Sequence, residues 1–362
     1  MIDQPWLAYL LGFVTAGLIA TVLTPVAIKA AVQLGVLDQP GGHKSHHLPT
    51  PYLGGLAMVV GFTVTVAVAT VVWPPVSGVG ELAAILGVAL ALATVGLLDD
   101  LRGLGVAPRI LAQLAAAGAL WAAGIRVDLL GVGVLDVVVT IVWIVGITNA
   151  MNLLDNMDGL SAGIATIAAL WFGLIAALNA QILVAPLAFA LAGCALGFLR
   201  QNRPPARIYM GDAGSLFLGV VLAAIGVKLA FPPLPPLSAA MIPILVLTVP
   251  VMDTALVMID RIRHGRSPFQ GGQDHLSHRL VRLGLPVPVA VSTIAVLGVA
   301  HGWMALIVSR VDLATALLVA GLIVLVDLLL FLLVLQVPVY PNSRGRDLVM
   351  RDRAVDEREP PR

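Results

Sequence analysis

Two adjacent carboxylates, Asp99 and Asp100, end an apolar stretch of the chain in the sequence GLLDDLRGLG. Like charges on neighbouring residues repel each other, and carboxylates at the C-terminal end of a helix oppose its dipole. A bound cation or a catalytic role would offset this cost. The alternative is a pair of solvated carboxylates that marks the end of a helix, and the residues alone leave both interpretations open.

A second polar cluster lies in the sequence NAMNLLDNMDG, where Asn149, Asn152, Asp155 and Asp158 follow one another at intervals of three residues. At this spacing a helix would place all four side chains on one face. Two amides and two carboxylates on a common face are suited to binding a nucleotide or a metal ion. The spacing does not match a calcium-binding loop, and a plain polar turn is the alternative.

A third cluster, YMGDAGS, places Asp212 at the start of an apolar stretch that we expect to be helical. Carboxylate oxygens are the ligands that Mg²⁺ prefers, and substrate phosphates commonly complete its coordination. Arg200, Arg203 and Arg207 lie just upstream and could bind a diphosphate. A helix cap at Asp212 and an ordinary cluster of cytoplasmic arginines are the alternatives.

A fourth cluster, DHLSHR, contains His275, His278 and Arg279, and a basic loop around Lys44 carries further histidines. A spacing of three would place His275 and His278 on one helical face beside Arg279. Zinc is the weaker interpretation, because no third nitrogen or sulfur ligand lies nearby. Phosphate binding by histidine and arginine is favoured, and two solvated loops are the alternative.

Long apolar segments separate these clusters and must position them. Of the 362 residues, 59% are hydrophobic and only 11% are charged, which excludes a soluble globular protein. Continuous apolar segments favour helices over the alternating strands of a β-barrel. We therefore predict an all-α, polytopic membrane protein with about eleven transmembrane helices. The predicted spans are 6–29, 52–73, 81–98, 109–124, 134–150, 160–178, 182–199, 214–231, 238–259, 287–309 and 313–336.

The basic residues predict the orientation of these helices. Of the 21 lysines and arginines, 18 fall in the odd-numbered loops and the C-terminal tail, and such residues favour the cytoplasmic side. The N-terminus should therefore be outside and the C-terminus cytoplasmic. All four polar clusters then lie at the cytoplasmic face, as in an enzyme that joins a water-soluble substrate to a lipid headgroup. The net charge of +1 gives no indication of nucleic-acid binding, and no nucleic acid is expected as a partner.

Two further carboxylates, Asp253 and Asp327, fall inside the ninth and eleventh predicted spans. An unpaired charge at the middle of a bilayer costs at least about 2.5 kcal/mol, so each should be neutral, face the bundle or pair with a partner. A transporter that uses these two residues as coupling sites is the alternative class of protein. Transport, however, does not require aspartates and histidines concentrated at one face of the membrane.

The apolar segments form one predicted domain, residues 1–339, which would be an integral membrane catalytic domain. From residue 340 onward the chain is charged and ends in prolines, so residues 340–362 are predicted to form a disordered cytoplasmic tail. The single cysteine, Cys194, excludes an intrachain disulfide. No feature of the sequence sets the oligomeric state, and a homodimer is left open.

The ordered motifs LLDD, NAMNLLDNMDGLSAG, RIYMGDAGSLFLG, RIRHGRSPF and DHLSHRL resemble those of the polyprenyl-phosphate N-acetylhexosamine-1-phosphate transferases. This resemblance implies transfer of N-acetylhexosamine-1-phosphate from a UDP-sugar to undecaprenyl phosphate, with release of UMP and with Mg²⁺ or Mn²⁺ as cofactor. It also implies a multi-pass protein of the bacterial plasma membrane with a cytoplasmic active site. The reaction would be the first membrane step in the synthesis of a cell-envelope glycopolymer.

The same resemblance assigns roles to individual residues. Asp212 matches the family's metal-binding aspartate, and Asp99 and Asp100 match a pair that acts on the lipid phosphate or the metal. Taken with the clusters above, the predicted catalytic residues are Asp99, Asp100, Asp158, His275 and His278; the predicted substrate-binding residues are Lys44, Asn152, Asp155, Arg207 and Arg279; and the predicted metal ligands are Asp212, Asp100 and Asp158.

Within the family, the DHLSHRL loop resembles the WecA/TagO branch, which uses UDP-N-acetylglucosamine. The MraY branch uses UDP-MurNAc-pentapeptide and typically carries three consecutive histidines in this loop. Transfer of GlcNAc-1-phosphate is therefore predicted, and the pentapeptide substrate is the alternative. Ser277 stands where the commoner WecA/TagO sequence has a histidine. Direct attack by the lipid phosphate and a covalent aspartate intermediate both fit the sequence.

Overall fold

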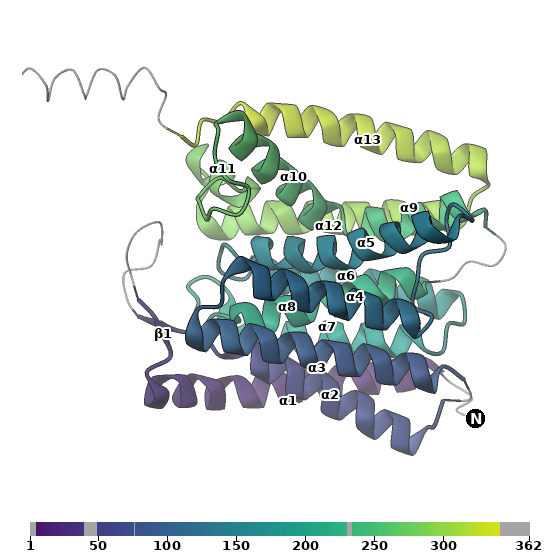
Figure 1. Ribbon diagram of the computed structural model, residues 1–362, viewed down its shortest axis with the longest axis horizontal. Helices are drawn as coiled ribbons and strands as arrows, with labels where there is room; N and C mark the ends of the chain where they lie inside the picture. Colours follow the sequence, from purple (N-terminus) through teal and green to yellow (C-terminus); the bar gives the residue numbers. More distant parts are fainter. Residues whose placement is uncertain (1–4, 40–48, 76, 230–233, 341–362) are drawn as a thin grey trace, which may run out of the picture.

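The computed structural model describes residues 5–39, 49–75, 77–229 and 234–340, and most of these residues are helical. The helices lie side by side in one bundle (Figure 1). In chain order they are α1 Pro5–Leu34, α2 Gly54–Val72, α3 Val79–Arg102, α4 Val106–Ala122, α5 Gly133–Leu154, α6 Leu160–Leu178, α7 Val184–Asn202, α8 Gly211–Lys228, α9 Pro236–Val246, α10 Thr248–Arg263, α11 Leu276–Arg282, α12 Val287–Val308 and α13 Leu313–Leu335. Two short strands, β1 Leu37–Asp38 and β2 Thr50–Pro51, pair antiparallel.

The prediction of an all-α, polytopic membrane protein is confirmed. Within the described part of the chain, nine helices are long and apolar enough to cross a membrane, and α4 is a shorter apolar helix. The predicted span 238–259 differs, because it consists of α9 and α10, which meet at an angle of 75°. Pro243 in α9 and Pro250 in the first turn of α10 lack the N–H groups that a continuous helix would use, which explains the break.

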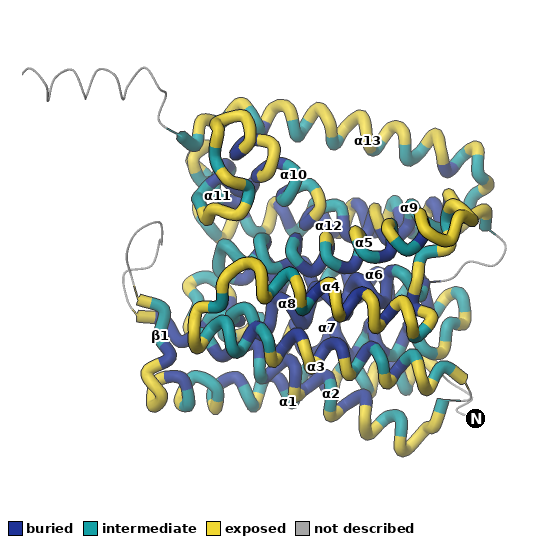
Figure 2. Tube along the Cα trace, in the orientation of Figure 1, coloured by how far each residue is buried: buried dark blue, intermediate teal, exposed yellow. Residues whose placement is uncertain are grey.

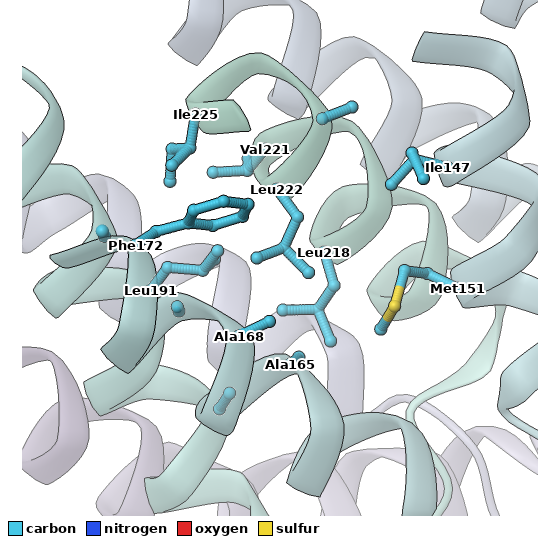
Figure 3. Close-up of a cluster of buried hydrophobic side chains, with 14 of the residues drawn as sticks. Ile147, Met151, Ala165, Ala168, Phe172, Leu191, Leu218, Val221, Leu222 and Ile225 are labelled. Atoms are coloured by element: carbon cyan, nitrogen blue, oxygen red, sulfur yellow. The ribbon is translucent and has the colours of Figure 1, made fainter. Parts of the chain in front are cut away.

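Helix α8 forms the centre of the bundle, and α13 lies at its edge. The residues of α8 from Ala213 to Gly226 are all buried, whereas α13 is exposed along most of its length (Figure 2). Phe172 of α6 and Leu191 of α7 pack against Leu222 and its neighbours on α8 (Figure 3). This packing buries the second half of α8 between its neighbours.

Alternating helix directions bring the polar clusters to one end of the bundle. The C-terminal ends of α3 and α5 lie at the same end as the N-terminal ends of α4 and α8, and α11 also lies there (Figure 1). The opposite end contains the start of α1 and the turn between α12 and α13. Residues at very different places in the sequence are therefore close in space.

Cysteine labelling should establish which end of the bundle faces the cytoplasm. Asp128 and Arg310 are exposed at the end that we expect to face outward, and Gln270 is exposed at the opposite end. In intact cells, Asp128→Cys and Arg310→Cys should react with an impermeant thiol reagent, and Gln270→Cys should react only after lysis. The native Cys194 is buried, so the background should be low. Labelling of Gln270→Cys in intact cells would reverse the orientation.

Candidate active site

Asp100 holds the start of α8. Its Oδ1 accepts a hydrogen bond from the backbone N–H of Asp212 at 2.8 Å, and its Oδ2 accepts one from Ala213 at 3.1 Å. Gly211 has a φ of +70°, and a Cβ there would lie 2.5 Å from Asp100 Oδ2, so the position requires glycine. Gly96 allows similarly close contact, since a Cβ there would lie 2.3 Å from the carbonyl oxygen of Asp212. Asp100 thus caps α8 and places Asp212 beside α3.

A single guanidinium group joins the carboxylates of two helices. Nη1 of Arg109, in the first turn of α4, lies 2.9 Å from Oδ2 of Asp99 and 2.7 Å from Oδ2 of Asp212. The two carboxylates therefore converge on one cationic position. The sequence interpretation missed Arg109 as a site residue and counted it only toward the charge of the cytoplasmic side. Its place in the helix directly after the Asp99–Asp100 pair was the available signal.

Two amides of α5 complete this part of the site. Nδ2 of Asn152 donates to Oδ1 of Asp212 and to Oγ of Ser215, both at 2.8 Å. One turn earlier, Nδ2 of Asn149 donates to Oε1 of the buried Gln113 on α4. Gln113 lies one helical turn after Arg109 on α4, so its pairing with Asn149 fixes the rotation of α4 against α5. The predicted common face of Asn149 and Asn152 is therefore confirmed.

The common face does not extend to Asp158. Helix α5 ends at Leu154, Asp155 follows as its C-cap, and Asp158 lies in the turn before α6. Gly159, with a φ of +75°, reverses the chain at this point. Oδ2 of Asp158 accepts a hydrogen bond from the backbone N–H of Ala206 at 2.8 Å, so this carboxylate also holds the segment before α8 in place.

The site carries an excess of negative charge. Burial, together with the charges of Asp212, Asp100 and Asp158, raises the pKa of Asp155 to about 8. This shift favours the protonated form of Asp155 at neutral pH. A bound cation would relieve the repulsion and favour its ionised form.

The histidine cluster is held by a second network. Nδ1 of His275 lies 2.8 Å from Oδ2 of Asp253. Asp253, which lies within a predicted span, therefore has a partner, one of the arrangements predicted from the sequence for a carboxylate at that depth. Asp274 accepts two hydrogen bonds from Arg261, at 2.7 and 2.9 Å, and one from the hydroxyl of Tyr340. Burial opposes ionisation of Asp274, but the hydrogen bonds from Arg261 and Tyr340 outweigh it and lower the pKa of Asp274 to about 2.

Arg279 lies beneath this network and not at its surface. Its side chain is fully buried and forms an ion pair with Asp260. Its guanidinium also donates to the carbonyl oxygen of Val337 at 2.8 Å, and Nε donates to that of Asp274 at 3.0 Å. In this conformation Arg279 joins the histidine loop to the end of α13, and its guanidinium has no exposed surface for a substrate.

One hydrogen bond links the two halves of the site. Oγ of Ser277 donates to Oδ1 of Asn156, in the turn that contains Asp155 and Asp158, at 2.6 Å. The rings of His275 and His278 lie 5.8 Å apart between their centroids. The structure thus brings the histidine loop against the carboxylate turn.

Two predicted substrate-binding residues lie apart from these contacts. Arg207 is exposed at the same end of the bundle, as are Arg200 and Arg203. Lys44 falls outside the residues that the structure describes, and so does the predicted tail from residue 341 onward. Tyr340, at the start of that predicted tail, packs against the histidine loop through Asp274.

The donor atoms fit a divalent cation that is shared with a substrate. Over the described residues, no group of three or more His, Cys, Asp or Glu side chains is arranged to hold a metal. Mg²⁺, however, is commonly bound by one or two carboxylates together with substrate phosphates. Asp99 and Asp212 supply two carboxylate oxygens that already converge on one positive charge. Both oxygens of Asp100 are instead occupied by N–H groups of α8.

Comparison with known proteins identifies the family. The model of glycosyl transferase family 4 matches residues 82–230. The chain is 32% identical over 307 residues to a probable undecaprenyl-phosphate N-acetylglucosaminyl 1-phosphate transferase of Bacillus subtilis. The matched region covers 82% of this chain and 84% of that protein. The chain belongs to glycosyl transferase family 4. This membership confirms the predicted enzyme class in place of the transporter alternative.

Two further relatives are named for different lipid and sugar substrates. A decaprenyl-phosphate N-acetylglucosaminephosphotransferase of Mycolicibacterium smegmatis is 34% identical over 303 residues, which cover 75% of this chain and 74% of that protein. A phospho-N-acetylmuramoyl-pentapeptide-transferase of Streptococcus agalactiae is 32% identical over 244 residues, which cover 60% of this chain and 73% of that protein. Both sugar substrates named in the sequence interpretation therefore occur among relatives.

His278 should make an unfavourable contribution to the stability of this family 4 protein in mild acid. Burial and the charges of His275 and Arg282 lower the pKa of His278 to about 4, although Asp253 and Asp274 act in the opposite direction. The unfolded chain takes up this proton near the ordinary pKa of about 6.5, whereas the folded protein does not, so stability is lost as the pH falls from about 6.5 toward 4. Asp155, whose pKa is raised, has the opposite effect over this range, so the contribution of His278 is measured by comparing the change in Tm between pH 7 and pH 5 in the wild type and in a His278 variant.

A substitution at this position tests the assignment. As the pH falls from 7 to 5, the Tm of His278→Asn should rise relative to that of the wild type, because asparagine binds no proton in the unfolded chain. His264→Asn, at a histidine whose side chain is 49% exposed, is the matched control, and its Tm should follow that of the wild type over this pH range. An equal change in Tm in the wild type and in His278→Asn would contradict the assignment.

Proposed function

We propose that this enzyme transfers N-acetylglucosamine-1-phosphate from UDP-N-acetylglucosamine to undecaprenyl phosphate, giving a lipid-diphosphate-linked sugar and UMP. The supporting observation is the convergence of Asp99 and Asp212 on one cationic position, next to the turn that contains Asp155 and Asp158. Relatives named for this transfer match along most of the chain, which supports the same substrates here.

The substrates carry charge that the site must balance. A lipid phosphate and a nucleotide diphosphate repel each other, so positive charge is needed between them. Arg109 already lies between two carboxylates, and the exposed Arg207 lies at the same end of the bundle. Asp212 and Asp99 would hold Mg²⁺ together with the substrate diphosphate. When bound, this ion neutralises charge on the diphosphate and makes the β-phosphorus more electrophilic.

We further propose that the lipid phosphate attacks directly. Its second pKa is about 6, so the group is already largely dianionic at neutral pH and needs little activation. One of its oxygens forms a bond to the β-phosphorus, the bond from that phosphorus to the bridging oxygen breaks, and UMP leaves with the electron pair. Asp100 is occupied as a cap of α8 and Asp99 is paired with Arg109, so neither carboxylate is placed as a free nucleophile.

The location of the site suits a lipid substrate. The carboxylates lie at the ends of apolar helices, where a phosphate headgroup can meet a water-soluble nucleotide while its polyprenyl chain stays in the membrane. The distribution of basic residues supports a cytoplasmic position for this end in a bacterial plasma membrane.

Incorporation of labelled sugar into lipid tests the substrate assignment. Purified protein should transfer label from UDP-N-acetylglucosamine to undecaprenyl phosphate when Mg²⁺ is present, and omission of the lipid phosphate should abolish the organic-soluble product. The same preparation should give no product from UDP-MurNAc-pentapeptide. Comparable turnover of the pentapeptide substrate would instead place the chain with the phospho-N-acetylmuramoyl-pentapeptide transferases.

A further inference from the structure

Within the described residues, two His–Asp pairs contain a largely buried histidine, and they differ in one respect. In the pair of His301 and Asp327, both ring nitrogens are engaged: Nδ1 with the carbonyl oxygen of Leu297 at 2.9 Å, and Nε2 with Asp327 at 3.0 Å. Neither ring nitrogen of His301 is therefore available to another group, and the pair joins α12 to α13. In the pair of His275 and Asp253, the carboxylate engages Nδ1, at 2.8 Å.

The second nitrogen of His275 is held differently. Nε2 lies 3.9 Å from Oδ1 of Asp274, which is beyond hydrogen-bond distance. Asp274 is itself occupied by two hydrogen bonds from Arg261 and one from Tyr340. The ring is therefore fixed through Nδ1, and Nε2 is the nitrogen that it can offer to another group.

Asp253 also fixes the backbone that carries this ring. Its Oδ1 accepts a hydrogen bond from the N–H of Leu276, the first residue of α11, at 2.7 Å. The side chains of Asp253 and His275 are both buried, with 1% and 5% of their surfaces exposed. One carboxylate on α10 thus sets both the position of α11 and the orientation of the histidine that precedes it.

We infer that Asp253 is a positioning residue for phosphosugar transfer, which acts by holding His275 with its proton on Nδ1 and its Nε2 directed to the substrate diphosphate. A carboxylate accepts hydrogen bonds and donates none, so the nitrogen facing Asp253 carries the proton. When Nε2 is also protonated, the ring donates to a phosphate oxygen and Asp253 balances its charge. The inference rests on the proposed function, since His275 then faces a substrate phosphate.

The position of the loop supports this role. Ser277 is hydrogen-bonded to Asn156, which lies between Asp155 and Asp158, so the histidine loop is fixed against the carboxylate turn. Elements packed around His275 present these charged or titratable groups: Asp253 from α10, Asp274 from the preceding loop, and His278 from α11. Of these, Asp253 makes the direct hydrogen bond to the ring.

Asp253→Asn changes the hydrogen-bond pattern with little change in volume. The N–H of Leu276 is a donor, so the amide oxygen should turn toward it and the NH₂ group toward the ring. The ring nitrogen that faces this NH₂ must then accept, which moves the single proton to Nε2 and prevents the doubly protonated, charged ring that Asp253 balances in the wild type. A loss in kcat of about 10- to 100-fold is expected, typical of residues that orient a functional histidine, with the KM for the UDP-sugar changed by less than about threefold.

The experiment combines kinetics with NMR of the full-length protein labelled with ¹⁵N-histidine, and His275→Gln assigns the signal of His275. The wild type should show Nδ1 of His275 protonated, and Asp253→Asn should show the proton on Nε2 together with the loss in kcat. Asp327→Asn is the matched control, because it alters a His–Asp pair away from the site and should retain the wild-type kcat.

The outcomes separate this inference from the proposed function. An unprotonated Nδ1 in the wild type, or a wild-type kcat in folded Asp253→Asn, would overturn the role of Asp253. If Asp253→Asn does not fold, the NMR measurement on the wild type still decides. Failure of the wild type to transfer sugar to lipid would contradict the proposed function instead, while the NMR result would still report whether Asp253 sets the tautomer.

Discussion

Asp212→Asn should lower the rate of sugar-phosphate transfer by at least about 100-fold while leaving the protein folded. The amide has nearly the same volume as the carboxylate and can keep the hydrogen bond from Asn152, so the bundle should not change. The substitution removes, however, the negative charge that pairs with Arg109 and that would bind a divalent cation. Initial rates at saturating Mg²⁺, with Tm as a check on folding, measure the effect.

A matched control separates charge at the site from charge in general. Asp128→Asn removes a carboxylate that is largely exposed at the opposite end of the bundle, where it pairs with Arg126. This variant should retain the wild-type rate. If Asp212→Asn also retained a near-normal rate at ordinary Mg²⁺ concentrations, Asp212 would serve only the start of α8.

Arg109→Gln should make both activity and stability depend more strongly on Mg²⁺. Without the guanidinium, Asp99 and Asp212 face each other with no positive charge between them. The variant should therefore have a lower Tm than the wild type in the absence of divalent ions, and Mg²⁺ should raise its Tm by more than it raises that of the wild type. The rate of transfer should fall by about 10-fold or more, because positive charge near the diphosphate is lost.

Arg102→Gln is the control for this prediction. Arg102 is an exposed arginine in the last turn of α3, at the same end of the bundle, so its removal changes the net charge equally. It should leave the Mg²⁺ dependence of the Tm unchanged. An equal response of the Arg109 and Arg102 variants to Mg²⁺ would show that Arg109 does not neutralise the two carboxylates.

The sequence predicted the helices well because apolar segments in a membrane must satisfy their backbone hydrogen bonds internally. The prediction was less accurate at the points where a helix breaks or ends. Span 238–259 contains enough apolar residues to cross a membrane, but its prolines at positions 243 and 250 break it into two helices. The spacing of three in NAMNLLDNMD predicted one helical face, whereas α5 ends before Asp155.

The candidate site was predicted by residue type but not by pairing. Asp99, Asp212 and Asn152 were named from their motifs, and the structure brings them together. Arg109 was missed because an arginine near a helix start equally fits the general excess of positive charge on the cytoplasmic side. The burial of Arg279 depends on contacts with Asp260 and the end of α13, which are distant in the sequence.

The nucleotide released during turnover tests the central claim most directly. Transfer of a sugar phosphate breaks the bond between the two phosphates of the UDP-sugar, whereas transfer of the sugar alone would release UDP. Purified protein given UDP-N-acetylglucosamine, Mg²⁺ and undecaprenyl phosphate should release UMP in amounts equal to the lipid product, and it should release none without the lipid. Release of UDP would contradict phosphosugar transfer, and release of UMP without lipid would contradict direct attack by the lipid phosphate.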